Sequence, residues 1–103
     1  MKAIVPASVL LLLLLPGGQA LADDDLYKTK NCFACHRVDR NHLGPSFRAI
    51  AARYVEDKEA EGKLATKVRE GSVGVWGQVP MPAQPQVTEA EALTLSRWIL
   101  QQR

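Results

Sequence analysis

Two cysteines and a histidine lie within five consecutive residues, Cys32-Phe33-Ala34-Cys35-His36, and the chain has no other cysteine. A thiol can add across a vinyl group and form a thioether, and two intervening residues let both sulfurs reach the two vinyl groups of one haem from a single short turn. The next residue can then direct its imidazole at the iron from the same side. This spacing is the attachment signature of c-type haem. We therefore expect Cys32 and Cys35 to bind one haem covalently and His36 to be an axial ligand of its iron.

Three other interpretations compete for the same residues. A Cys-x-x-Cys pair can form a disulfide or a thioredoxin-like redox site, but such sites accompany a longer chain with a βαβ pattern, which this sequence does not show. A structural zinc site needs four ligands, and His42 is the only other histidine. A chance match is the third possibility, and the export signal described below argues against it. We favour covalent haem over all three.

Methionine is the expected second axial ligand, because haem electron carriers often use it. Met81 is the only methionine besides Met1, and it stands between Pro80 and Pro82. Each proline fixes its own φ and restricts the residue before it, which stiffens the loop that would hold a weak sulfur–iron bond. Filling a gap in the core is the commoner role of methionine, and His42 is a rival ligand. A proline-rich loop is an unusual place for a core residue, so we favour Met81.

The first 22 residues have the pattern of a secretory leader. Lys2 precedes an apolar stretch from Ala3 to Leu15, Pro16-Gly17-Gly18 interrupts it, and Ala20-Leu21-Ala22 supplies the small residues of a cleavage site. A membrane span needs about 20 apolar residues, so we expect cleavage after Ala22 rather than an uncleaved anchor. Residues 23–103 then form one domain in the periplasm, outside the bacterial inner membrane, where haem is attached.

The composition is that of an ordinary globular protein, with 23% charged residues, 47% hydrophobic residues and a formal net charge of +2. This charge is too mild for a nucleic-acid binder, which would carry a basic stripe. A domain as small as residues 23–103 has a thin core, and such domains often need a disulfide, a metal or a buried cofactor to fold.

Helical signals dominate after the leader. We expect a short helix after the acidic residues 23–25, a second that starts at Gly44-Pro45, and a third over residues 59–70 that ends at Gly71. The glycines and prolines of residues 71–87 predict a functional loop. No alternating strand pattern is present, which favours an all-α fold.

A last helix is predicted to follow the loop. Thr88 with Glu91 three residues later is the pattern of a capping box. The helix after it should bury one side, which consists of Ala92, Leu95, Trp98 and Ile99.

Four motifs and a terminal Arg97-Trp98 follow one another along the chain: Cys32-x-x-Cys35-His36, Leu43-Gly44-Pro45, Gly71-Ser72-x-Gly74-Val75-Trp76-Gly77 and Val79-Pro80-Met81-Pro82. In this order and near these intervals they closely resemble the small bacterial class I cytochromes c known as cytochrome c-551 or c8. The resemblance covers essentially all of residues 23–103 and is more specific than the haem motif alone. The loop after Met81, around residues 84–86, is slightly longer than the family leads us to expect.

The resemblance implies an all-α fold of four or so helices wrapped around one haem c, with His36 and Met81 as axial ligands. It also implies that the Pro45 carbonyl accepts the Nδ1 proton of His36, a contact that orients the ligand. The indole N–H of Trp76 would contact a haem propionate, and Lys67 would be a basic partner of the same group. Simple core packing is the alternative role for Trp76, whereas Trp98 is expected in the core.

A six-coordinate iron has no open position for a substrate, but it can change its charge by one. We therefore expect an electron carrier and not an enzyme. An apolar haem edge with a basic rim would suit transient docking of redox partners on a monomer, although solubility alone could explain the basic residues. The edge should include Phe33, Ala34, Leu43, Val79, Pro80 and Pro82, and the rim Lys28, Lys30 and Arg40.

The resembled family implies that electrons come from a membrane quinol-oxidising complex and pass to a terminal reductase or oxidase, often a haem nitrite reductase or a cbb3-type oxidase. The chain itself would meet the membrane only through such complexes. A haem-based peroxidase or gas sensor, in which Met81 leaves the iron, is the competing class. A haem-free dithiol oxidoreductase is a third, and titration of free thiols would distinguish it.

Overall fold

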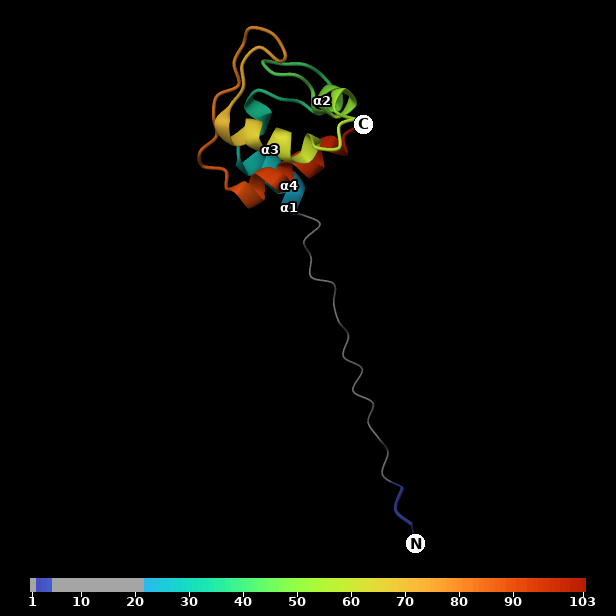
Figure 1. The fold of residues 1–103 in the computed structure, drawn as a ribbon. Coiled ribbons are helices and arrows are strands. Elements are labelled where there is room, and N and C mark those ends of the chain that lie inside the picture. The colour runs from blue at the N-terminus through green and yellow to red at the C-terminus, as the bar shows by residue number, and fades with distance from the viewer. Residues whose placement is uncertain (1, 5–21) are drawn as a thin grey trace.

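The computed structural model describes residues 2–4 and 22–103 (Figure 1). Within this part of the chain the elements are α1 (Ala22–Thr29), the 3-10 turn η1 (Cys32–Ala34), α2 (Phe47–Arg53), α3 (Ala60–Glu70) and α4 (Glu89–Leu100). These residues contain no strand, and a single antiparallel bridge pairs Ser72 with Met81. The prediction of an all-α fold is confirmed.

Most of the expected leader, residues 1–22, lies outside the described residues. Ala22, after which cleavage is expected, is the first residue of α1. None of the helices in the described ranges has both the length and the apolar character that a membrane crossing requires.

The helix α1 begins at Ala22 and contains residues 23–25, so it starts earlier than the expected position after these acidic residues. The chain leaves α1 through Asn31, which adopts a left-handed backbone conformation with φ of 63°. This residue is the N-cap of η1, the turn that begins at Cys32 and has Cys35 as its C-cap.

The helix α2 begins at Phe47, so the expected start at Gly44-Pro45 was wrong. Ser46 has an extended backbone and is the N-cap, and its hydroxyl oxygen accepts a hydrogen bond from the Ala49 N–H at 3.0 Å. A serine side chain satisfies an N–H group that would otherwise have no partner, and proline at the first helical position cannot do this. Gly44 and Pro45 lie in the preceding loop, where both contact His36.

The helix α3 ends at Glu70, and Gly71, with a φ of 81°, is its C-cap, as the sequence predicted. The capping box of α4 is also present. The Thr88 hydroxyl accepts from the Glu91 N–H at 3.1 Å, and the Glu91 carboxylate accepts from the Thr88 N–H at 3.0 Å. These two hydrogen bonds fix where the loop ends and α4 begins.

The core lies where α4 packs against α1, α2 and α3, and Figure 1 shows α3 crossing in front of α4. Three of the four residues expected on the buried side of α4 are buried: Ala92, Leu95 and Ile99. Trp98 is only partly buried, and its ring stacks on Tyr27 with 5.0 Å between the centroids. It therefore closes the edge of the core rather than filling its centre.

Two loops have parts that lie above α3 in Figure 1. One comprises residues 38–45, drawn in green, and the other residues 71–87, drawn in orange. Both contribute residues to the same cavity. The helices thus form a base, and the loops form the walls of the candidate site.

Candidate functional site

A cavity of about 370 Å³ lies between the helices and the two loops. Its volume is within the range of pockets that hold a small molecule or cofactor. All seven site residues expected from the sequence line it: Cys32, Cys35, His36, Pro45, Lys67, Trp76 and Met81. The remaining walls include apolar side chains of α2, α3 and α4, such as Ile50, Leu64 and Leu95.

The cysteines sit on a tight turn that backbone hydrogen bonds hold together. The Cys32 carbonyl accepts from the N–H groups of both Cys35, at 3.2 Å, and His36, at 3.0 Å. Both thiols are free and partly buried. Burial raises the pKa of the Cys32 thiol, with a smaller increase from the neighbouring Cys35. The turn therefore presents two thiols and one imidazole to the same cavity.

Arg37 braces this turn from outside, a role that the sequence did not predict. Its guanidinium donates to the Phe33 carbonyl and, at 3.0 Å, to the His36 carbonyl. The Tyr27 hydroxyl also donates to the His36 carbonyl, at 3.3 Å. The backbone next to the imidazole is consequently held by two side chains.

The His36 imidazole is buried and has one defined orientation. Its Nδ1–H donates to the Pro45 carbonyl at 2.7 Å, and its ring stacks on Phe47 with 5.1 Å between the centroids. Burial lowers the pKa of His36, and the hydrogen bond to Pro45 opposes this shift. The neutral ring with its proton on Nδ1 leaves the Nε2 lone pair available to a metal.

Gly44 provides the space that this ring needs. A Cβ atom at residue 44 would lie 2.7 Å from Cε1 and 2.9 Å from Nδ1 of His36, closer than real side chains approach. Gly44 and Phe47 thus confine the imidazole, while Pro45 sets its rotation. Sequence reasoning placed Pro45 here through the resemblance but did not foresee the role of Gly44.

Met81 is held on another wall of the cavity by its backbone. The Met81 N–H donates to the Ser72 carbonyl at 2.9 Å, and the Ser72 N–H donates back to the Met81 carbonyl at 3.0 Å. A Cβ at Gly71 would lie 2.6 Å from the Met81 carbonyl oxygen, so only glycine fits beside this pair. The flanking prolines are therefore not the sole source of stiffness, since the bridge closes the base of the loop.

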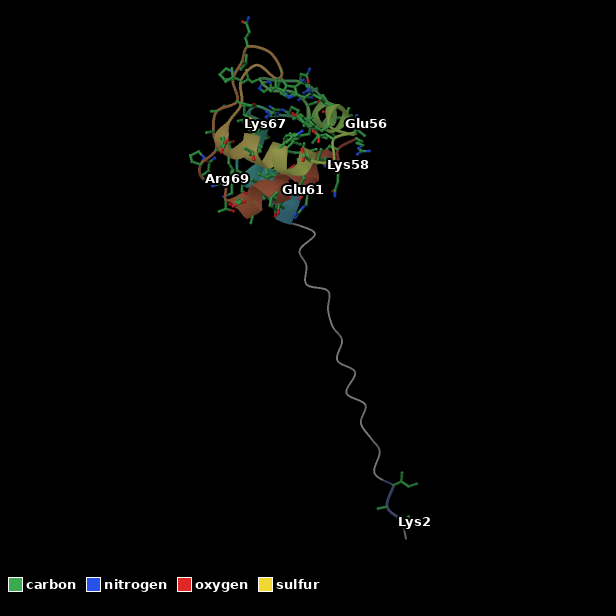
Figure 2. The ribbon with its side chains drawn as sticks, viewed as in Figure 1. Lys2, Glu56, Lys58, Glu61, Lys67 and Arg69 are labelled. Atoms are coloured by element: carbon green, nitrogen blue, oxygen red, sulfur yellow. The ribbon has the colours of Figure 1, made fainter. Side chains whose placement is uncertain are left out.

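Trp76 is 42% exposed, which is inconsistent with the alternative that it is a simple core residue. It lines the cavity, and the Arg53 guanidinium lies over its ring, 4.7 Å from the centroid. Lys67 also lines the cavity, on the side of α3 that faces the loops (Figure 2). No periodic signal links residues 53 and 76, so sequence reasoning missed Arg53.

The donor set fits a haem better than a bare metal ion. A buried imidazole with a free Nε2, a thioether and two thiols line one largely apolar space. Within the described residues, no group of three or more His, Cys, Asp or Glu side chains could hold an ion alone, which argues against zinc. His42 also lines this cavity, and its side chain is exposed.

The apolar edge expected around the site is exposed. Phe33, Leu43 and Val79 expose 43%, 61% and 68% of their surface. One of the three residues expected in the basic rim is already paired, because Lys30 forms an ion pair with Glu91 at 3.1 Å. Lys30 therefore ties the end of α1 to the start of α4, whereas Lys28 and Arg40 are exposed.

The chain is similar in sequence and in fold to known cytochromes c. Residues 22–103 match the family model described as Cytochrome c. Cytochrome c-552 of Nitrosomonas europaea is 48% identical over 87 residues, 84% of each chain. Cytochrome c-551 of Azotobacter vinelandii is 47% identical over 77 residues, 75% of this chain and 93% of that one. The crystal structure of Nitrosomonas europaea cytochrome c552 aligns with a TM-score of 0.77 at 46% identity, covering 79% of this chain and all of that one.

Proposed function

Since the chain belongs to the cytochrome c family, we propose that Cys32, Cys35, His36 and Met81 hold its haem and that the protein carries single electrons in the periplasm. The family implies one covalently bound haem c. The named relatives are electron-transfer cytochromes and not enzymes, and the same role applies here.

The observation that carries the ligand assignment is the geometry of His36. Its Nδ1–H is committed to Pro45, its ring is confined by Gly44 and Phe47, and it lines the cavity that Met81 also lines. Haem c supplies an iron that accepts and releases one electron. His36 orients a nitrogen toward that iron, Met81 presents a sulfur, and the thiols of Cys32 and Cys35 form the thioethers.

Trp76 and Lys67 are proposed to neutralise a haem propionate. Both line the cavity, and an indole N–H at its wall can donate to an acceptor. Neutralising a negative propionate favours the ferrous state. Trp76→Phe keeps the aromatic ring against Arg53 and removes only the N–H, so the redox potential should fall. An unchanged potential in both Trp76→Phe and Lys67→Gln would contradict this assignment.

Export and partners complete the proposal. The family match begins at residue 22, so the expected leader, cleaved after Ala22, contributes almost nothing to the matched domain. We expect a monomer that docks briefly through the exposed Phe33, Leu43 and Val79. Its donor would be a quinol-oxidising complex, and its acceptor a terminal reductase or oxidase, such as a nitrite reductase or a cbb3-type oxidase.

Met81→Ala tests the ligand assignment. The variant should stay coloured, because the thioethers remain, but its ferric spectrum should lose the weak long-wavelength band of sulfur ligation and its potential should fall sharply. Val79→Ala, an exposed neighbour in the same loop, is the matched control and should keep the band. A band that persists in Met81→Ala would exclude Met81. If His42→Ala changes the axial ligation instead, His42 is the ligand.

A further inference from the structure

We propose that Arg53 is a positioning residue that holds the cavity wall formed by residues 73–80 closed, and so limits how readily an outside ligand displaces Met81. We call residues 73–80 the loop tip. The proposal rests on the haem ligation proposed above, and the experiment below separates the two.

The loop tip has few attachments of its own. Ser72 and Met81 pair at its base through two backbone hydrogen bonds. Between them, in the described part of the chain, one hydrogen bond involves the tip, and the Arg53 guanidinium donates it to the Val75 carbonyl at 2.9 Å. The same guanidinium lies 4.7 Å from the centre of the Trp76 ring. Arg53 therefore makes both the hydrogen bond and the cation–π contact that hold the tip.

Arg53 stands on a fixed support. It is the last residue of α2, and Phe47, Ile50 and Ala51 of that helix are buried in the core. Because the core holds this helix in place, contacts from its last residue fix the loop tip relative to the core. Without it, the tip would be tied only at its base.

The loop tip forms part of the wall of the cavity, so its position affects the site. The tip residues that line the cavity are Gly74, Val75, Trp76, Gln78, Val79 and Pro80. Met81 follows directly after Pro80. Outward movement of the tip would open the cavity wall beside Met81 and expose the sulfur ligand to competitors from solvent.

Arginine suits this task better than lysine. Its planar guanidinium can stack on an indole while one N–H donates to a carbonyl, whereas an ammonium group is a compact charge that does not stack. Arg53→Lys should therefore retain part of the effect. Arg53→Gln should lose nearly all of it while keeping a residue that favours a helix.

The test uses the haem-loaded protein and three variants, Arg53→Gln, Arg53→Lys and the control Arg48→Gln. Arg48 is an exposed arginine of the same helix, and its side chain makes no hydrogen bond or ion pair within the described structure. Two quantities are measured: hydrogen exchange of the Ser72 and Met81 amides, whose hydrogen bonds close the base of the loop tip, and the affinity of the ferric protein for imidazole, which competes with a methionine ligand.

Arg53→Gln should exchange the Ser72 and Met81 amides faster, because movement of the tip breaks their pairing more often, while the amides of α4 keep their parent rates. Its affinity for imidazole should rise about tenfold, the change expected on losing one exposed cation–π contact and one hydrogen bond. Arg53→Lys should fall between this variant and the parent, and Arg48→Gln should match the parent.

Parent values for both quantities in Arg53→Gln would overturn the proposal. Faster exchange throughout α4 would also overturn it, because Arg53 would then act on global stability. A parent protein without the sulfur band would refute the Met81 ligation and the imidazole part with it. In that case the hydrogen-exchange comparison still decides whether Arg53 holds the loop tip.

Discussion

Gly44→Ala should destabilise the protein by forcing the His36 imidazole from its place. The added Cβ would lie 2.7 Å from Cε1 of His36, whereas ordinary contact begins near 3.4 Å. The ring or the loop must therefore move by about 0.7 Å, against the hydrogen bond to Pro45 and the stacking on Phe47. Overpacking of a well-filled site costs about 1–3 kcal/mol.

The matched control is the same substitution at Gly62. This glycine lies in the first turn of α3, is exposed, and would place a Cβ in open space. Alanine in a helix is favoured over glycine by about 0.5–1 kcal/mol, so Gly62→Ala should stabilise the protein. The two alanines should thus change the free energy of unfolding in opposite directions.

Thermal unfolding of the haem-loaded proteins measures both effects. In a domain of this size each kcal/mol shifts the midpoint by about 4–8 °C. Gly44→Ala should also alter the resonances of the His36 ring, since its orientation changes. If Gly44→Ala unfolds at or above the parent temperature while Gly62→Ala is stabilised, the argument that Gly44 provides space for the imidazole is wrong.

Three further predictions concern local structure. Asn31→Gly should raise the unfolding midpoint slightly, because Asn31 holds a left-handed φ of 63° that glycine adopts without strain; a lower midpoint would contradict this. Thr88→Ala should cost about 1 kcal/mol in urea unfolding through loss of the α4 cap, and a value near zero would show that the capping box is dispensable. The Thr88 backbone N–H first, and then Lys30, lower the pKa of Glu91 below its usual range. The resulting stability is present above the unfolded pKa and is lost as the pH falls through the folded pKa, so Glu91→Gln should flatten the acid limb of the stability–pH curve.

Short-range chemistry explains what the sequence made predictable. The spacing of Cys32, Cys35 and His36 follows from the size of one turn, and all three line one cavity. The capping box at Thr88 and the helix stop at Gly71 also depend only on near neighbours, and both are present. Such features can be identified because each is a hydrogen bond or a backbone angle within a few residues.

Contacts between distant residues were not predictable in the same way. Arg53 contacts the segment around Trp76 across more than twenty residues, and no periodicity marks the pair. Lys30 was expected at a free rim, but its partner Glu91 lies on another helix. The start of α2 was misplaced because Pro45 resembles a first helical residue, whereas its carbonyl is committed to His36. Tertiary partners decide each of these cases.

His36 and Met81 belong to different halves of the chain, 45 positions apart in the sequence. If both bind one iron as proposed, the metal becomes a cross-link that closes this stretch into a ring. By the chain-entropy relation used for disulfides, a closed ring of this length restricts the unfolded chain by about 4 kcal/mol. Much of the stability of the folded domain would then come from this cross-link rather than from its thin core. Each time the sulfur leaves the iron, the unfolded chain would regain the conformational entropy that the ring removes.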